Sequence, residues 1–253
     1  MLTSIGASVS AEETTTAAAA AASSKLIISE PVSMNLNPLP DWYSATQENI
    51  DKACISKLDY TESMFKAEKT GFGLVYASCN ENAKNSIYIY QTVDNWSQSV
   101  FDLSASSFAN KTELPGKVTT LPMFSKDRGY DKINIGTPEV ITYNNGEYAV
   151  FDMWYTKNKT QHTSQVLATV VNGYYVVIFY DIIPNSKAVT KEIPDSAKNS
   201  MKGFMKSVSY LDVQEKSILS REQIIIIAGA AACLLFLAIL SSLVKSRKRK
   251  RYL

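Results

Sequence analysis

Runs of hydrophobic residues divide the 253-residue chain into a mixed body and one long apolar segment. Within the body, EYAVFDMWY at 147–155 predicts a strand, and a shorter strand at 140–143 precedes it. Between them lies Asn144-Asn145-Gly146, and an Asn-Gly pair is typical of a tight hairpin turn, because both residues tolerate positive φ. The same arrangement recurs around Asn172-Gly173, which joins strands predicted at 165–171 and 174–181.

The strand YYVVIFYD at 174–181 is apolar on both of its faces, so we expect both faces of the sheet to be covered. The segments 73–78 and 86–91 predict a further hairpin. Helices are predicted at 196–208, 61–69 and 97–109, and the first has a single apolar stripe with Asp195 as its N-cap. The pattern predicts an α+β fold with a largely antiparallel sheet covered by helices.

The long apolar segment at 224–244 contains 21 residues without a charge, which as a helix would cross about 30 Å of hydrocarbon. A cluster of cations follows at once. Such a cluster marks the cytoplasmic side, so the sequence predicts a transmembrane helix, a cytoplasmic tail at 245–253 and a body outside the cell. The topology-determining residues are Lys245, Arg247, Lys248, Arg249, Lys250 and Arg251.

Residues 1–11 resemble the second half of a signal peptide, with small residues ahead of Glu12 but no basic start. We therefore expect Met1 to be an internal start and the natural product to begin upstream. The alternative is a tail-anchored protein whose body faces the cytoplasm. Residues 12–24 form a low-complexity linker, 25–211 the extracytoplasmic domain, and 212–223 a polar stalk.

A resemblance follows from the order of segments. MNLNPLPDWYSAT is followed by LDYTESMFKAEKTGFGLVYAS and SIYIYQT, then by two hairpins and the helix GFMKSVSYL. This order is similar to the Mog1/PsbP-like fold. More narrowly, it resembles uncharacterised membrane-anchored extracytoplasmic proteins of Gram-positive bacteria, in which an LP-x-WY strand precedes a helix and a GxxLxA-type strand. The resemblance covers about 33–211 and the anchor, and it implies a fold used mostly for binding and assembly, without catalytic residues to carry over.

Charge and motifs exclude several classes of function. The net charge is +2, but residues 1–223 carry 20 Lys and Arg against 24 Asp and Glu, so the body is mildly acidic and not typical of a nucleic-acid binder. Phosphate-binding loops of the GxxxxGK[ST] or GxGxxG type are absent from the sequence, and we expect no cofactor. Asp127 and Asp131 flank a glycine, but Arg128 between them argues against calcium, so an ordinary solvated turn is expected.

Two candidate reactive features remain. Cys54 and Cys79 could form a disulfide in an oxidising compartment, closing a loop worth about 3 kcal/mol, or they could stay as two reduced, half-buried thiols. Cys233 lies in the apolar segment as a packing residue. His162 is the only histidine and lies in the hydrophilic stretch KNKTQHTSQ, so we expect a solvated loop residue; a catalytic base would need a nucleophile and an acid nearby.

The aromatic residues are the remaining indication of function. Most of those at 174–180 are expected in the core, whereas Trp42 and Trp96 adjoin polar loops and are candidate recognition aromatics. The first hypothesis is a non-catalytic binding or assembly module of the cell envelope, anchored in the lipid bilayer and contacting another envelope protein or a ligand. The second is an envelope hydrolase, which one cleft combining His162 with a Ser and an acidic residue would support.

Overall fold

The computed structural model describes residues 25–184 and 192–214. The predicted signal remnant, linker, transmembrane helix and basic tail lie outside these residues, as does the stalk beyond residue 214. Among the helices that are described, none is long and apolar enough to cross a membrane. The membrane segment at 224–244 and the orientation of the chain therefore stay predictions.

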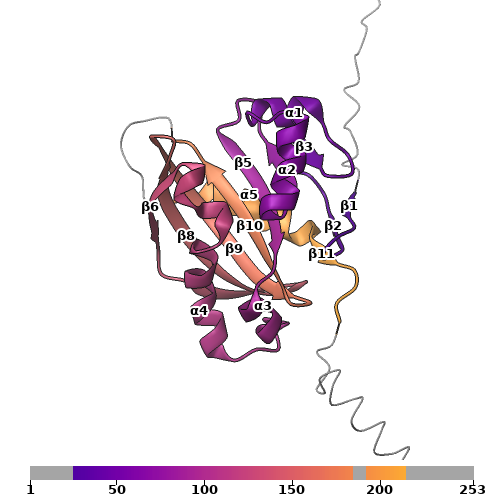
Figure 1. Cartoon of the computed structure of the whole chain (residues 1–253), viewed down its shortest axis with the longest axis vertical. Coiled ribbons are helices and arrows are strands. Elements are labelled where there is room, and N and C mark those ends of the chain that lie inside the picture. The colour runs from indigo at the N-terminus through magenta and orange to yellow at the C-terminus, as the bar shows by residue number, and fades with distance from the viewer. Residues whose placement is uncertain (1–24, 185–191, 215–253) are drawn as a thin grey trace, which may run out of the picture.

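An antiparallel sheet of eight strands forms the centre of the fold (Figure 1). Its strands lie in the order β3-β4-β5-β10-β9-β8-β6, and β7 pairs with the first half of β8. Strands that follow one another in the chain mostly pair directly, but β10 inserts between β5 and β9. The bounds are β3 Tyr43–Thr46, β4 Leu74–Cys79, β5 Asn85–Thr92, β6 Tyr130–Ile135, β7 Glu139–Tyr143, β8 Gly146–Lys157, β9 Thr160–Val171 and β10 Tyr174–Ile182.

A second, three-stranded sheet joins the two ends of the described chain. It consists of β1 (Leu26–Ile28), β2 (Met34–Leu36) and β11 (Ser209–Tyr210), with β2 in the middle and both pairings antiparallel. The loop between β1 and β2 is fixed to the large sheet by Gln91 on β5. The Gln91 amide accepts from the Val32 N–H and donates to the Val32 carbonyl, at 2.9 Å each.

The helices cover both faces of the large sheet, so the fold has three layers. The bounds are α1 Lys52–Lys57, α2 Glu62–Phe72, α3 Asn95–Val100, α4 Phe108–Thr119 and α5 Asp195–Ser207, with short 3-10 turns η1 Pro122–Phe124 and η2 Lys126–Arg128. Helices α1 to α4 contribute to one hydrophobic core, and α5 and the small sheet contribute to the other. Strand β10 serves both: Tyr175, Val177 and Phe179 lie in the first core, and Val176, Ile178 and Tyr180 in the second. This confirms that a strand apolar on both faces is covered on both faces.

The predicted α+β class with a largely antiparallel sheet is confirmed. The hairpin of β9 and β10 turns at Asn172 and Gly173, whose φ angles of 53° and 80° are those of the tight turn expected there. The predicted hairpin before it also forms, but its two-residue turn is Asn144-Asn145, and Gly146 is already in β8.

Three local predictions are wrong. The single helix expected at 97–109 is two helices, because α3 starts earlier at an Asp94 capping box and α4 starts at the Ser107 N-cap. Asp195 is the first residue of α5, and Pro194 before it makes no side-chain cap. His162 does not lie in a solvated loop: it belongs to β9 and is 7% exposed. Strands β8 and β9 extend into the polar stretch because a two-residue turn at Asn158-Lys159, both with positive φ, lets them pair to their ends.

Candidate functional site

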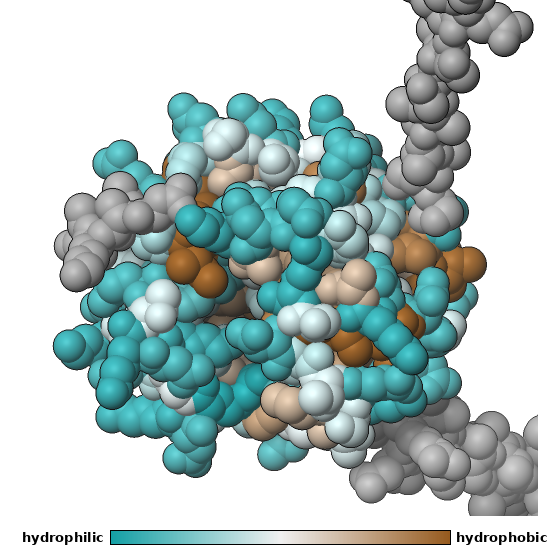
Figure 2. Space-filling model, turned by 90° about the horizontal axis from the view of Figure 1, so that it is seen from above, coloured by the Kyte–Doolittle hydropathy of each residue, from teal (hydrophilic) through white to brown (hydrophobic). Residues whose placement is uncertain are grey.

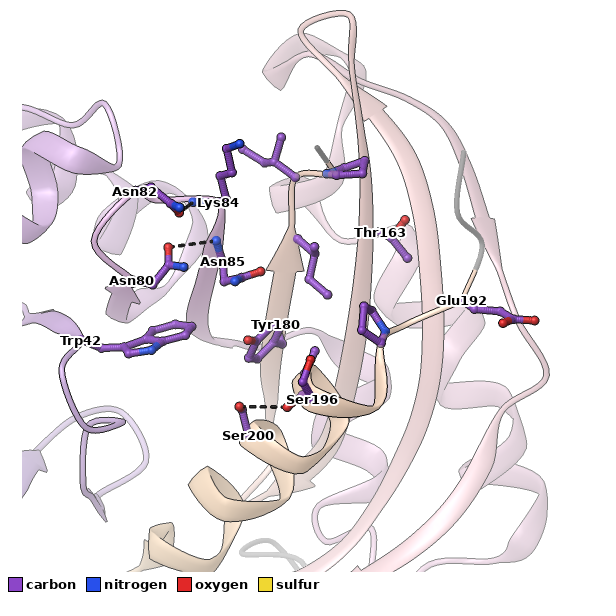
Figure 3. Close-up of a pocket in the computed structure, with 15 residues that line it drawn as sticks. Trp42, Asn80, Asn82, Lys84, Asn85, Thr163, Tyr180, Glu192, Ser196 and Ser200 are labelled. Atoms are coloured by element: carbon purple, nitrogen blue, oxygen red, sulfur yellow. Dashed lines mark hydrogen bonds between the residues drawn. The ribbon is translucent and has the colours of Figure 1, made fainter. Parts of the chain in front are cut away.

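A cavity of about 570 Å³ opens where β10 ends, on the sheet face that α5 covers (Figure 3). Five segments that are distant in sequence form its walls: the residue before β3, the β4–β5 hairpin, Thr163 of β9, the end of β10, and the start of α5. Its lining residues are Trp42, Asn80, Asn82, Lys84, Asn85, Thr163, Tyr180, Ile182, Ile183, Pro184, Glu192, Pro194, Ser196, Ala197 and Ser200. We call this cavity the Trp42 pocket.

The aromatic wall of the pocket is a pair of rings. The Trp42 ring lies 5.9 Å from the Tyr180 ring at an interplanar angle of 52°, and Figure 3 shows the indole directed towards Tyr180. Tyr180 is only 3% exposed, so its ring is held by the core, whereas Trp42 is half-buried. Rings fixed in this way offer a ligand apolar surface at a small cost in side-chain entropy.

The polar wall comes from asparagines on the β4–β5 hairpin. The Asn80 side-chain oxygen accepts the N–H of Asn85 at 3.2 Å, and that of Asn82 accepts the N–H of Lys84 at 3.0 Å. These bonds fix the carbonyl ends of both amides. Their NH₂ groups have no partner among the described residues, so both remain available as donors.

Helix α5 supplies the opposite polar wall. The Ser200 hydroxyl donates to the Ser196 carbonyl at 3.0 Å (Figure 3), and it also lies against the Tyr180 phenol, whose pKa it lowers. The charged side chains in the described lining are one lysine, Lys84, and one glutamate, Glu192, so their formal charges balance. The pocket therefore combines an aromatic surface with amide and hydroxyl groups, and its chemistry suits a neutral polar ligand.

A buried network of four side chains lies on the opposite face of the same end of the sheet. Asp181 follows Tyr180 in β10, so its side chain points the other way. Its carboxylate accepts hydrogen bonds from the Tyr155 and Ser164 hydroxyls at 2.7 Å each, and it pairs with Nδ1 of His162 at 2.8 Å. The His162 ring stacks on Tyr155, with centroids 5.1 Å apart.

The charge state of the network follows from these bonds. Burial by itself would raise the pKa of Asp181. The hydrogen bonds from His162, Ser164 and Tyr155 and the attraction of His162 lower the pKa by more than burial raises it, so it lies below its usual value. The carboxylate is ionised and can only accept, so Nδ1 of His162 carries the proton. Burial also raises the pKa of Tyr155 far above its usual value, which keeps this phenol a donor.

This network brings His162, a serine and an aspartate together, as the hydrolase hypothesis requires, but not in the order of a catalytic triad. A nucleophilic serine must donate its proton to the histidine. Ser164 instead donates to Asp181, and its side chain is fully buried. The pair of His162 and Asp181 can orient a proton acceptor, because only Nε2 of the imidazole remains for a ligand.

The other predicted site residues are dispersed. Trp96 on α3 stacks on Tyr175 at 5.8 Å, on the face of β10 opposite to Tyr180, so the structure does not bring it to Trp42. Cys54 and Cys79 are buried free thiols rather than a disulfide. Asp127 lies in η2 and Asp131 in β6, both exposed. The six cations of the tail lie outside the described residues.

Sequence reasoning missed the asparagines of the β4–β5 hairpin and Asp181. The only signal for Asp181 was a carboxylate ending the otherwise apolar strand YYVVIFYD, which must find partners if it is buried. The asparagines of CNENAKN read as ordinary turn residues, and they are turn residues. They line the pocket because Trp42 and α5 approach this hairpin in the folded chain, and a local sequence pattern does not predict that approach.

Known proteins resemble the chain in structure rather than in sequence. No protein-family model matches the chain, and no curated protein matches it. Among solved structures, it is similar to the solution structure of cyanobacterial PsbP (CyanoP) from Synechocystis sp., with a TM-score of 0.42 and 6% sequence identity, over 70% of this chain and 86% of that one. At this TM-score no ligand or site residue carries over, so the function is argued from this chain's own residues.

Proposed function

We propose that the chain is a membrane-anchored, non-catalytic binding module of the cell envelope whose body lies outside the cell. The support for its location is the uncharged segment at 224–244, followed by six cations that resist translocation. The sequence resemblance to membrane-anchored extracytoplasmic proteins of Gram-positive bacteria agrees with this arrangement.

The ligand we propose is a neutral, hydroxyl-rich one, such as an envelope glycan, held in the Trp42 pocket. The observation that carries this is the placement of the Trp42 and Tyr180 rings beside the free amide donors of Asn80 and Asn82, with Ser200 opposite. A sugar presents C–H groups to an aromatic ring and hydroxyls to amides, and the balanced charges of the described lining residues favour an uncharged partner.

The surface favours a small ligand over a large protein partner at this end. Figure 2 shows the molecule from above as mostly hydrophilic, with hydrophobic residues in separate patches. A stable protein interface usually has a contiguous apolar centre. A recessed pocket with convergent polar groups is instead the form of a small-molecule site.

The test is calorimetric titration of the purified full chain with a panel of neutral N-acetylglucosamine-containing oligosaccharides. We expect saturable binding by at least one of them, and Trp42→Ala should weaken it about tenfold or more. Trp96→Ala is the matched control, because Trp96 is also half-buried but lies on the other face. Absence of binding across the panel, or equal affinity in wild type and Trp42→Ala, would contradict the proposal.

The location is tested separately, by adding protease to intact cells that express the chain with an upstream signal and tags on body and tail. We expect loss of the body tag and retention of the tail tag. A protected body with a digested tail would support the tail-anchored, cytoplasm-facing alternative.

A second candidate function is an envelope hydrolase, favoured by the pair of His162 and Asp181 at 2.8 Å. Ser164 argues against a serine mechanism, since its proton goes to Asp181. We therefore expect a fluorophosphonate probe to leave the chain unlabelled. Labelling that is lost in both His162→Gln and Ser164→Ala would favour the hydrolase.

A further inference from the structure

A second cavity, of about 480 Å³, lies over the network of Asp181 and His162, on the sheet face opposite to the Trp42 pocket. The end of α1, helix α2, turn η2 and the β8–β9 hairpin enclose it. Its lining residues are Lys57, Leu58, Asp59, Tyr60, Met64, Glu68, Ala83, Ser86, Tyr88, Arg128, Lys157, Asn158, Thr160, His162, Asp181 and Ile183. We call it the Lys157 pocket.

Two of its three cations already have counter-ions. Lys57 pairs with Glu81 at 2.9 Å, and Arg128 pairs with Glu68 while donating to the Met123 carbonyl at 2.9 Å. Asp181 has its three donors, so its charge is compensated as well. These paired groups do not need a ligand.

Lys157 differs from them. Its ammonium lies 4.9 Å from the centre of the Tyr130 ring, and within residues 25–184 and 192–214 it has no hydrogen bond and no ion pair. Burial lowers the pKa of Lys157, and attraction by the nearby carboxylate of Asp181 offsets only part of this decrease. A half-buried cation without a counter-ion is costly, which indicates that the pocket is incomplete without an anion.

His162 provides a second group beside it. Its Nδ1 is bonded to Asp181, whereas Nε2 has no partner in the described part of the chain and is not among the buried unpaired polar atoms, so it is open to the pocket. In the β8–β9 register Lys157 pairs with Thr160, two residues from His162 on the same side of β9. Such diagonal neighbours are about 7 Å apart, a separation that one carboxylate can bridge.

The rest of the wall suits the body of a small organic molecule. Leu58, Met64 and Ile183 are apolar, and Tyr60 and Tyr88 add ring faces. Burial raises the pKa of Tyr60 to about 12 and that of Tyr88 well above its usual value, so both phenols remain neutral. The cavity is within the usual size range of small-molecule sites.

From the unpaired Lys157 ammonium and the open Nε2 of His162, we propose that this pocket binds a small organic acid whose carboxylate lies between these two residues. Because Nδ1 of His162 donates to Asp181, the imidazole contacts the anion through a protonated Nε2.

The test uses the purified full chain in detergent, with benzoate as the probe and benzamide as its uncharged analogue at equal ionic strength. Because His162 is the only histidine in the chain, its imidazole gives a single set of NMR signals. We expect benzoate, and not benzamide, to shift these signals saturably.

Variants separate the proposed contacts from general effects of charge. Lys157→Gln should weaken benzoate binding about tenfold or more. Lys159→Gln makes the same charge change two residues away, at an exposed residue outside the lining, and should bind as the wild type does. His162→Gln should also bind benzoate more weakly, because it removes the Nε2 contact.

Three results would overturn the proposal: no saturable shift with benzoate, an equal shift with benzamide, or unchanged affinity in a Lys157→Gln variant that unfolds cooperatively. None of these bears on the Trp42 pocket, which lies on the other face of the sheet. Loss of oligosaccharide binding in Trp42→Ala together with normal benzoate binding would show that the two sites are independent.

Discussion

Tyr148 on β8 and Tyr210 on β11 share a hydrogen bond of 2.6 Å between their hydroxyl oxygens. The bond joins the large sheet to the last strand of the described chain. Asn145 donates to the same Tyr148 hydroxyl at 2.8 Å, so the buried phenol of Tyr148 takes part in two hydrogen bonds.

Removing either hydroxyl should loosen this end of the fold. Tyr148→Phe and Tyr210→Phe should each lower the free energy of unfolding by about 1 kcal/mol, and the double variant by clearly less than the sum, because the two changes remove one bond. Urea denaturation measures this. Tyr174→Phe is the control, since the Tyr174 hydroxyl has no hydrogen bond within the described residues; strict additivity would contradict the pairing.

Asp181→Asn should destabilise the chain in a pH-dependent way. The pKa of Asp181 is lower in the folded state than in the unfolded state, so its contribution is present above about pH 4 and is lost as the pH falls through the folded-state value. At neutral pH we expect a loss of about 2–4 kcal/mol, because the amide places an NH₂ group against donors. Denaturation curves should converge for wild type and variant in acid, and a constant difference would be inconsistent.

Lys157→Met should stabilise the protein at neutral pH, by roughly 0.5–1 kcal/mol. Since the folded-state pKa of Lys157 is lowered, the folded chain binds fewer protons than the unfolded chain between the two values, and the stability of the wild type rises with pH there. The advantage of the variant should therefore shrink at alkaline pH. Lys159→Met, at an exposed residue, is the control. If Lys157→Met is no more stable than the wild type, burial of the Lys157 ammonium does not destabilise the folded chain.

Gly73→Ala should lower the free energy of unfolding by at least about 2 kcal/mol. Gly73 ends α2 at a φ of 78°, and an added Cβ would lie 2.0 Å from the backbone oxygen of Gln91. Gly71 lies two residues earlier within the same helix with nothing within 4 Å of its Cβ position. Gly71→Ala should thus stabilise by up to about 1 kcal/mol, and thermal denaturation of the pair distinguishes the two effects.

The thiols of Cys54 and Cys79 should react only after unfolding. The hydrogen bond with Cys79 and burial together raise the pKa of Cys54, and its thiol also contacts the Ala77 carbonyl at 3.6 Å. In a Cys233→Ser background, a thiol-specific reagent should label neither cysteine in the native chain and both in denaturant. A disulfide would leave both unlabelled in denaturant without reductant.

Local features of the fold were predictable, because they depend on neighbours in sequence. Asn172-Gly173 forms a tight turn because of its own backbone preferences. The apolar stripe of α5 can likewise be read from the spacing of its own residues. The partners of Asp181 were not predictable, since they come from two other strands, β8 and β9, whose register is set by the whole sheet. His162 was misassigned for a related reason: polar residues in a strand resemble a loop until a buried carboxylate is known to face them.

The candidate sites show the same limit. Trp42 was identified as a recognition residue because an aromatic beside polar residues is unusual, but Trp96 carried the same signal and instead stacks on Tyr175. Lys157 had no signal at all. Whether a lysine has a counter-ion depends on residues such as Glu68 and Glu81, which approach from other elements and already pair with other cations.

The position of β2 between β1 and β11 has a consequence for biosynthesis. Residues 26–36 leave the ribosome early, but the partner of Met34 in β11 is Tyr210, which emerges only after nearly the whole body. Until then the β1–β2 hairpin has an open edge, and an isolated two-stranded hairpin is marginally stable. The body can therefore complete its fold only near the end of translation. If Tyr210 has not been made or cannot reach β2, the chain presents β2 as an unpaired strand to chaperones and proteases.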